Sequence, residues 1–182
     1  MSMNTKIGST KAMGQSIEDY LKKVPMEARW ELVSGAFISY TVNHFKTVYD
    51  QGGKEKFDEF MKENGRFAAT VYKGFADRFG FTGSDAKSAG AILPAMVVLA
   101  FGPQQKFEIE EATARKARVK CINCAFWNAV QAKKITDNLC SGWSQYSWDD
   151  RAKVINPKLI STLVKARPRG DSICEWVIEL KA

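Results

Sequence analysis

The chain has little of what most enzymes and nucleic-acid-binding proteins carry. His44 is the only histidine among its 182 residues, so any Cys–His or Ser–His–Asp catalyst would have to use it. Lysine and arginine exceed aspartate and glutamate by 27 to 20, but they are interleaved with acids and form no basic block or nucleic-acid-binding signature. We therefore expect no nucleic-acid partner. The net charge of +7 is compatible with an anionic small molecule or a solvated basic surface.

Long apolar segments are also missing. The longest run, residues 89–101, contains Gly90 and Pro94 and is shorter than the roughly 20 residues that a membrane span needs. It predicts a buried helix or a subunit contact. Residues 1–15 are small and polar, without the apolar region of a signal peptide. We expect a disordered tail over 1–15, a single domain over 16–182, a cytoplasmic location and no membrane segment.

Cysteine is scarce and unevenly placed. Four cysteines do not make the framework of a disulfide-rich secreted domain. Only Cys121 and Cys124 form a C-x-x-C pair, whereas a structural zinc site usually draws on two such pairs. We therefore expect no zinc, and the sequence leaves any other cofactor unknown. All four cysteines and four of the five tryptophans lie between Cys121 and Trp176, which predicts a nucleophile or soft-ligand site, or a core rich in sulfur and aromatic rings.

Three of these thiols are candidate nucleophiles. Cys124 precedes a predicted helix, whose N-terminus lowers the pKa of a thiol, and Cys140 and Cys174 could face the same pocket. The alternative for each is that free cysteine packs as a small hydrophobic residue. His44 is a candidate for proton transfer near neutral pH, although a lone helical histidine is more often a surface or packing residue.

Aromatic side chains in the same stretch suggest a pocket for a planar ligand. The candidates for substrate binding are Trp127, Trp143, Tyr146, Trp148 and Trp176. We assign Arg169 to a ligand carboxylate, because a guanidinium can hold both carboxylate oxygens. An ordinary aromatic core and a solvated arginine in a turn are the alternatives.

Apolar periodicity predicts a fold of two parts. Spacings of three to five residues from Met26 to Val48 indicate a helix that stops at Gly52-Gly53. The spacing from Phe57 to Phe79 indicates another helix, or two with a break near Gly65. Gly80 is the expected end of the second helix. A turn over 82–85 should cap the helix that carries the apolar run.

The second part changes to the alternation typical of strands. Residues 107–110 and 117–121 predict a hairpin, and residues 160–166 and 173–180 predict two further strands. Between the pairs we expect one helix over 124–134 capped by Asn123 and another from Asp137 to about Trp148. The predicted class is α+β: a helical N-terminal half, then a small antiparallel sheet of about four strands with two intervening helices.

At these residues the chain resembles a known family. The pattern comprises Lys120-Cys121-x-x-Cys124, Leu139-Cys140, Ile155-Asn-Pro157 and Gly170-Asp-x-x-Cys174-Glu-Trp176. It is similar to the L-2-amino-thiazoline-4-carboxylic acid hydrolase family. That resemblance implies hydrolytic opening of a small cyclic substrate bearing a carboxylate. It also implies Cys140 or Cys124 near the reacting carbon, Cys174 in the pocket wall and Arg169 on the carboxylate.

The late Gly-Asp-x-x-Cys pattern is also similar to small-molecule-binding domains of the 4-vinyl reductase type. In those domains an upstream cysteine and an acid help to bind zinc, and here the corresponding places hold Ala166 and Leu163. The departure argues against a metal.

Three functions therefore stay open. The first is a hydrolase of a C–N or C–S bond in a small heterocycle. The second is a ligand-binding or sensory domain for an aromatic or cyclic anion, without chemistry. The third is a structural subunit, in which the apolar helix of residues 89–101 joins a partner or a second copy of the chain.

Overall fold

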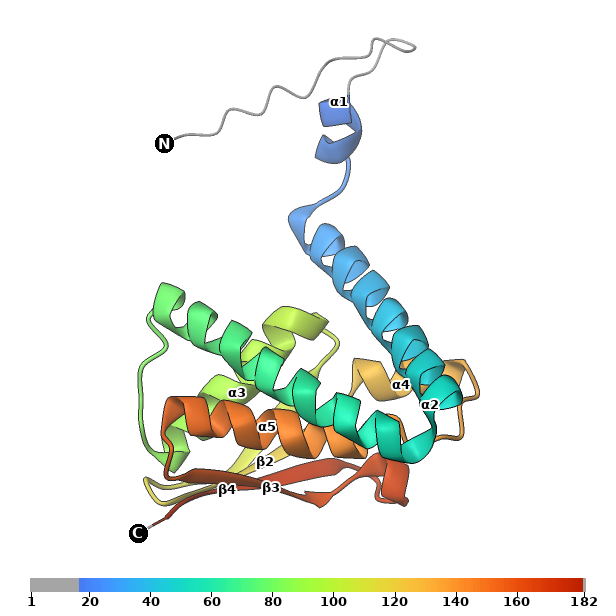
Figure 1. Ribbon diagram of the computed structural model, residues 1–182. Coiled ribbons are helices and arrows are strands. Elements are labelled where there is room, and N and C mark those ends of the chain that lie inside the picture. The colour runs from blue at the N-terminus through green and yellow to red at the C-terminus, as the bar shows by residue number, and fades with distance from the viewer. Residues whose placement is uncertain (1–16, 182) are drawn as a thin grey trace.

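The computed structural model describes residues 17–181 (Figure 1), so the tail predicted over 1–15 lies outside the described residues. The chain forms three helices, a hairpin, two helices and two further strands. The elements are α1 (Ile17–Lys22), α2 (Met26–Phe79), α3 (Ala86–Phe101), β1 (Lys106–Ala112), β2 (Lys116–Asn123), α4 (Ala125–Ala132), α5 (Ser141–Ile155), β3 (Leu159–Lys165), a short 3₁₀ helix η1 (Arg167–Arg169) and β4 (Cys174–Leu180). The predicted α+β class is confirmed.

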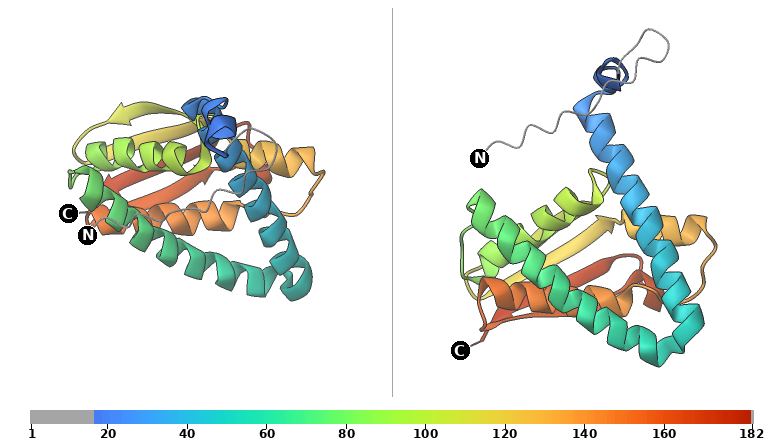
Figure 2. Two further views of the ribbon diagram at one scale, coloured as in Figure 1. Left: turned by 90° about the horizontal axis from the view of Figure 1, so that it is seen from above. Right: turned by 45° about the horizontal axis from the view of Figure 1, so that its top comes forward.

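The four strands form one antiparallel sheet in the order β1-β2-β4-β3. The last strand, β4, therefore lies inside the sheet, next to β2. In this pairing Trp176 of β4 is opposite Val119 of β2, and Cys174 of β4 is opposite Cys121 of β2. Helices cover one face of the sheet (Figures 1 and 2). Because side chains alternate along a strand, the other face carries charges, with Glu175 ion-paired to Arg118 and Lys165.

Helix α2 bends sharply at Gly53, where φ is 69° and ψ is −178°. Glycine tolerates this conformation because it lacks a Cβ, and the two segments of α2 then run in different directions (Figure 1). Of the two alternatives for residues 57–79, one helix or two, the structure has one, without a break near Gly65. Gly65 lies within the second segment, where an added Cβ would stand 3.0 Å from Asp150 Oδ2 and 3.2 Å from Ser147 N. This glycine permits the close approach of α2 to α5.

The apolar run lies in α3. Asp85 caps the helix by accepting the Ser88 N–H at 2.7 Å, and Gly80 ends α2 in the left-handed conformation. Ala89, Leu93 and Val97 are all buried. One side of the run is therefore buried, whereas Leu99 on the other side is 51% exposed, so a contact with a partner stays a prediction.

The two later helices differ from their predicted bounds. Helix α4 is capped by Cys124 rather than by Asn123, because the Asn123 amide instead donates to the Gln104 carbonyl at 2.6 Å. Helix α5 begins after Cys140 rather than at Asp137, and it continues beyond Trp148 to Ile155. The longer α5 adds two turns that pack against α2.

Candidate functional site

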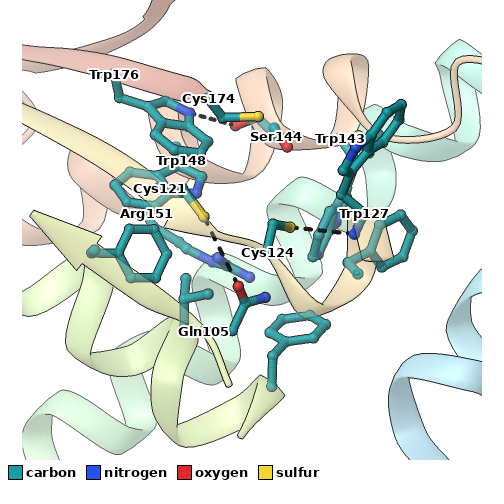
Figure 3. A pocket seen from close by; sticks show the side chains of 15 residues that line it. Gln105, Cys121, Cys124, Trp127, Trp143, Ser144, Trp148, Arg151, Cys174 and Trp176 are labelled. Atoms are coloured by element: carbon teal, nitrogen blue, oxygen red, sulfur yellow. Dashed lines mark hydrogen bonds between the residues drawn. The ribbon is translucent and has the colours of Figure 1, made fainter. Parts of the chain in front are cut away.

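A cavity lies between the helices and the covered face of the sheet (Figure 3). The volume inside it is about 40 Å³, enough for about three water molecules and well below the volume of pockets that hold a drug-sized ligand. The lining is mostly aromatic, aliphatic and sulfur-bearing. It comprises Val97, Phe101, Gln105, Phe107, Cys121, Cys124, Phe126, Trp127, Cys140, Trp143, Ser144, Trp148, Arg151, Cys174 and Trp176.

Helix α5 supplies one long wall of this cavity. Trp143, Ser144, Trp148 and Arg151 follow one another at spacings of one to four residues along the helix and all line the cavity. Trp143 and Arg151 are eight residues apart, which corresponds to roughly 12 Å along a helix axis. Trp127 and Trp143 are half-buried while Trp148 and Arg151 are buried. The cavity therefore has its rim at Trp127 and its inner end at Arg151, whose guanidinium carbon reaches back to 5.9 Å from the centre of the Trp143 ring.

Stacked and edge-on rings hold the aromatic walls in place. The indoles of Trp148 and Trp176 are parallel with centroids 4.2 Å apart, and Trp176 Nε1 donates to the Ser144 carbonyl at 3.4 Å. Trp143 lies 5.6 Å from the ring of Phe101 and 5.8 Å from that of Phe126. The indole N–H of Trp176 is satisfied by backbone, so the face that the ring turns to the cavity is apolar.

The structure brings all four cysteines to this cavity. Cys121 and Cys174 are opposite each other on β2 and β4, Cys124 stands at the N-terminus of α4 and Cys140 at that of α5. All four are free thiols. The spacing of the four cysteines along the sequence does not predict that they meet, because their positions depend on the order of the strands in the sheet.

Cys124 is the most acidic of the four thiols. Its pKa is lowered to about 7, chiefly by a hydrogen bond with the Cys121 thiol; burial opposes the shift, and the Trp127 N–H contributes to it. The same interaction, followed by burial, raises the pKa of Cys121. Burial raises the pKa of Cys140 and of Cys174. Only Cys124 therefore carries a substantial thiolate fraction near neutral pH.

Three of the predicted site residues lie elsewhere. His44 is exposed on α2, between the rings of Tyr40 and Phe60. Arg169 is exposed, and its guanidinium donates to the Leu163 carbonyl at 3.0 Å. Tyr146 is half-buried with the Lys62 ammonium 5.6 Å from its ring centre. The assignments of His44 to proton transfer and of Arg169 to a carboxylate have no geometric support, because neither side chain lines the cavity.

Sequence reasoning missed two polar residues of the cavity. Arg151 is buried on α5, and Gln105 is buried before β1, where its Oε1 accepts the Ala125 N–H at 3.2 Å. Arg151 follows Trp148 by three residues and Trp143 by eight, so it shares their side of a helix. A prediction that ended this helix at Trp148 hid that relationship.

The structure shows neither a metal site nor a membrane span within residues 17–181. No group of three or more histidine, cysteine, aspartate or glutamate side chains in that range is arranged to hold a metal ion. Of the helices described, none combines the length and apolar character that crossing a membrane requires.

No family model and no curated protein matches the chain. The fold is similar to a solved structure of trafficking protein particle complex subunit 3 from Naegleria fowleri, which is covalently bound to palmitic acid. The TM-score is 0.60 at 10% sequence identity, and the match covers 84% of this chain and 98% of that one. The prediction of a hydrolase is wrong: the solved structure that shares this fold is a trafficking-complex subunit that carries palmitic acid, and His44, the histidine that a hydrolase would use, lies outside the cavity.

Proposed function

We propose that the protein is a non-catalytic binding domain whose cavity takes one long apolar chain of the fatty-acyl class. The observation that carries the proposal is the wall of the cavity, which contains four tryptophans, three phenylalanines and four cysteines. The cavity is narrow, about 40 Å³, so a chain that enters it has to push these side chains apart. The similar trafficking-complex subunit holds palmitic acid, which supports a lipid over the cyclic anion expected from the sequence.

The chemistry of the lining supports an apolar ligand. Each methylene group moved from water into such a cavity contributes about 0.8 kcal/mol, so a long chain gains affinity without many polar contacts. Gln105, Ser144 and Arg151 are the polar residues that contribute to the lining, and two of these three are uncharged. The cavity contains no carboxylate or imidazole that could act as a general acid or base.

Tryptophan fluorescence gives a direct test. Fatty acids brominated along the chain quench nearby indoles, so a 16-carbon brominated acid should quench the protein saturably. Val97→Phe, which adds a ring to the cavity wall, should abolish this quenching. Leu99→Phe is the matched control on the same helix, because Leu99 is exposed and does not line the cavity. Equal quenching of both variants would show that the lipid binds elsewhere.

The composition of the purified protein is an independent test. Native mass spectrometry followed by organic extraction should recover a long-chain lipid at close to one molecule per chain. A retained aromatic or cyclic acid in its place would contradict the lipid assignment. The free thiols agree with the reducing, cytoplasmic setting that we propose for this binding domain.

A second candidate function is that of a subunit in a larger assembly. Val33, Phe37 and Tyr40 are 67%, 47% and 70% exposed on the first segment of α2, and their spacing places them on one side of the helix. That segment extends away from the sheet and its covering helices (Figures 1 and 2). The likeness to a complex subunit supports this role. Sedimentation should show an oligomer, which Val33→Asp with Tyr40→Asp converts to a monomer; a monomeric wild-type chain would count against self-association.

A further inference from the structure

Arg151 is a buried cation at the inner end of the cavity. Its side chain comes from the second half of α5 and is 4% exposed. The guanidinium carbon lies 3.8 Å from the ring centre of Tyr72 and 5.9 Å from that of Trp143. It lines the cavity together with Trp148 (Figure 3). An arginine keeps its charge even when buried, so the apolar cavity ends at a positive charge.

No carboxylate within residues 17–181 neutralises this charge. Arg151 takes part in no salt bridge within that range, and its Nε has no hydrogen-bond partner there. Asp149, two residues before Arg151, pairs instead with Lys153 and accepts the Ser161 N–H at 3.0 Å. Contacts with aromatic rings offset only part of the cost of removing a guanidinium from water. The positive charge of Arg151 is therefore not balanced by an acidic side chain of the described residues.

Two further polar groups close to Arg151 are also without partners. The Tyr72 hydroxyl, whose ring lies against the guanidinium, and the Ser147 hydroxyl, one helical turn before Arg151, are both buried and unpaired among the described residues. Buried polar atoms are rarely left unpaired in folded proteins. Neither residue lines the cavity, so among these unpaired polar groups the guanidinium of Arg151 is the one placed to meet a ligand.

We propose that Arg151 recognises the carboxylate of a free long-chain acid that enters the cavity head first. The inference rests on the proposed binding of an apolar chain and adds the identity of its head group. The carboxylate lies against Arg151 at the inner end, and the hydrocarbon extends past Trp148 and Trp143 towards the rim at Trp127. An ester, an alcohol or an acyl group attached through a thioester offers no negative charge to this guanidinium.

The test compares three ligands of equal chain length on the delipidated full-length protein. Hexadecanoic acid, hexadecanol and methyl hexadecanoate compete against a fluorescent polyene fatty acid. The acid should bind the wild-type protein at least tenfold more tightly than the alcohol or the ester, which corresponds to about 1.4 kcal/mol. This comparison needs no variant, so it holds even if substitutions at position 151 impair folding.

Variants then assign the preference to one side chain. Arg151→Gln should reduce the acid-to-alcohol affinity ratio to about one. Arg151→Lys should keep part of the preference because it keeps the charge. Arg169→Gln is the matched control, since Arg169 is an exposed arginine outside the cavity, and it should behave as the wild type does.

The outcomes separate the inference from the function on which it rests. If none of the three lipids binds, the proposed binding of an apolar chain fails. If all three bind with equal affinity, or if Arg151→Gln keeps the preference for the acid, the lipid site stands and the role of Arg151 is overturned. An acyl group covalently attached to Cys124, detected by intact mass and released by hydroxylamine, also overturns it, because the carboxyl group would then not be free.

Discussion

The indole rings of Trp148 and Trp176 stack face to face, with centroids 4.2 Å apart and planes 12° from parallel. One ring comes from α5 and the other from β4, so the pair joins the helical layer to the sheet. Both rings are buried and both line the cavity. The same contact therefore stabilises the fold and forms the wall against which a ligand would lie.

Replacing one of these indole rings by a methyl group should destabilise the folded protein. We expect Trp148→Ala to lower the free energy of unfolding by about 3–5 kcal/mol, because a large buried ring leaves an unfilled space. Trp127→Ala is the control: its half-buried ring at the rim should cost only about 1–2 kcal/mol. Urea denaturation followed by far-UV circular dichroism measures both. Equal losses would mean that the stacked pair adds nothing beyond ordinary burial.

Alkylation should single out Cys124. Its pKa of about 7 implies that the thiolate fraction, and with it the rate of reaction with iodoacetamide, rises with pH and reaches half its maximum near pH 7. Peptide mapping of partially labelled protein identifies the thiol that reacts first. Cys124→Ser should remove the fast phase, and Cys174→Ser should leave it in place. A first label on Cys140 or Cys174 would contradict the assignment.

Two helical glycines should respond in opposite directions to alanine. An added Cβ at Gly90 would stand 2.7 Å from Cβ of Ala117, so Gly90→Ala should force α3 away from β2 and cost about 1–3 kcal/mol. Gly74 has nothing within 4 Å of that position, and Gly74→Ala should stabilise α2 by about 0.5–1 kcal/mol. Thermal unfolding compares the two. If Gly90→Ala raised the melting temperature, α3 and β2 would be packed less closely than the structure indicates.

Glu175 should make stability depend on pH at the acidic end. Burial raises the pKa of Glu175, but the ion pairs with Lys165 and Arg118 outweigh it and hold this pKa below its ordinary value. The stabilisation is therefore fully present above about pH 4.5. It is lost as the pH falls through the lower pKa of the folded state, because protonation removes the charge that the two cations share.

The variant that tests this is Glu175→Gln. It should lower the free energy of unfolding at pH 7 by about 1–3 kcal/mol, and the difference from the wild type should shrink as the pH falls below about 4.5. Glu179→Gln on the same strand is the control, since Glu179 is exposed, and it should change stability by less than about 0.5 kcal/mol. Urea titrations over the pH series measure both. A difference that does not vary with pH would exclude the ion pairs as its source.

Local pattern was enough for most of the secondary structure. The alternation at residues 117–121 and 173–180 corresponds to β2 and β4, and the caps at Gly80 and Asp85 are where the sequence places them. These features depend on residues that are neighbours along the chain. The predictions were wrong where a side chain has a remote partner, as at Asn123, whose amide donates to Gln104 instead of capping a helix.

The sequence by itself determined the α+β class and the concentration of thiols and indoles in the last third of the chain. Only the tertiary structure decided which of these residues share a cavity, because the order β1-β2-β4-β3 sets Cys174 opposite Cys121. It also decided that Arg151, and not Arg169, is the arginine at the cavity. The charge of Arg151 is buried because the second segment of α2 packs over it. The spacing of apolar residues within α5 alone does not predict which other element covers that helix.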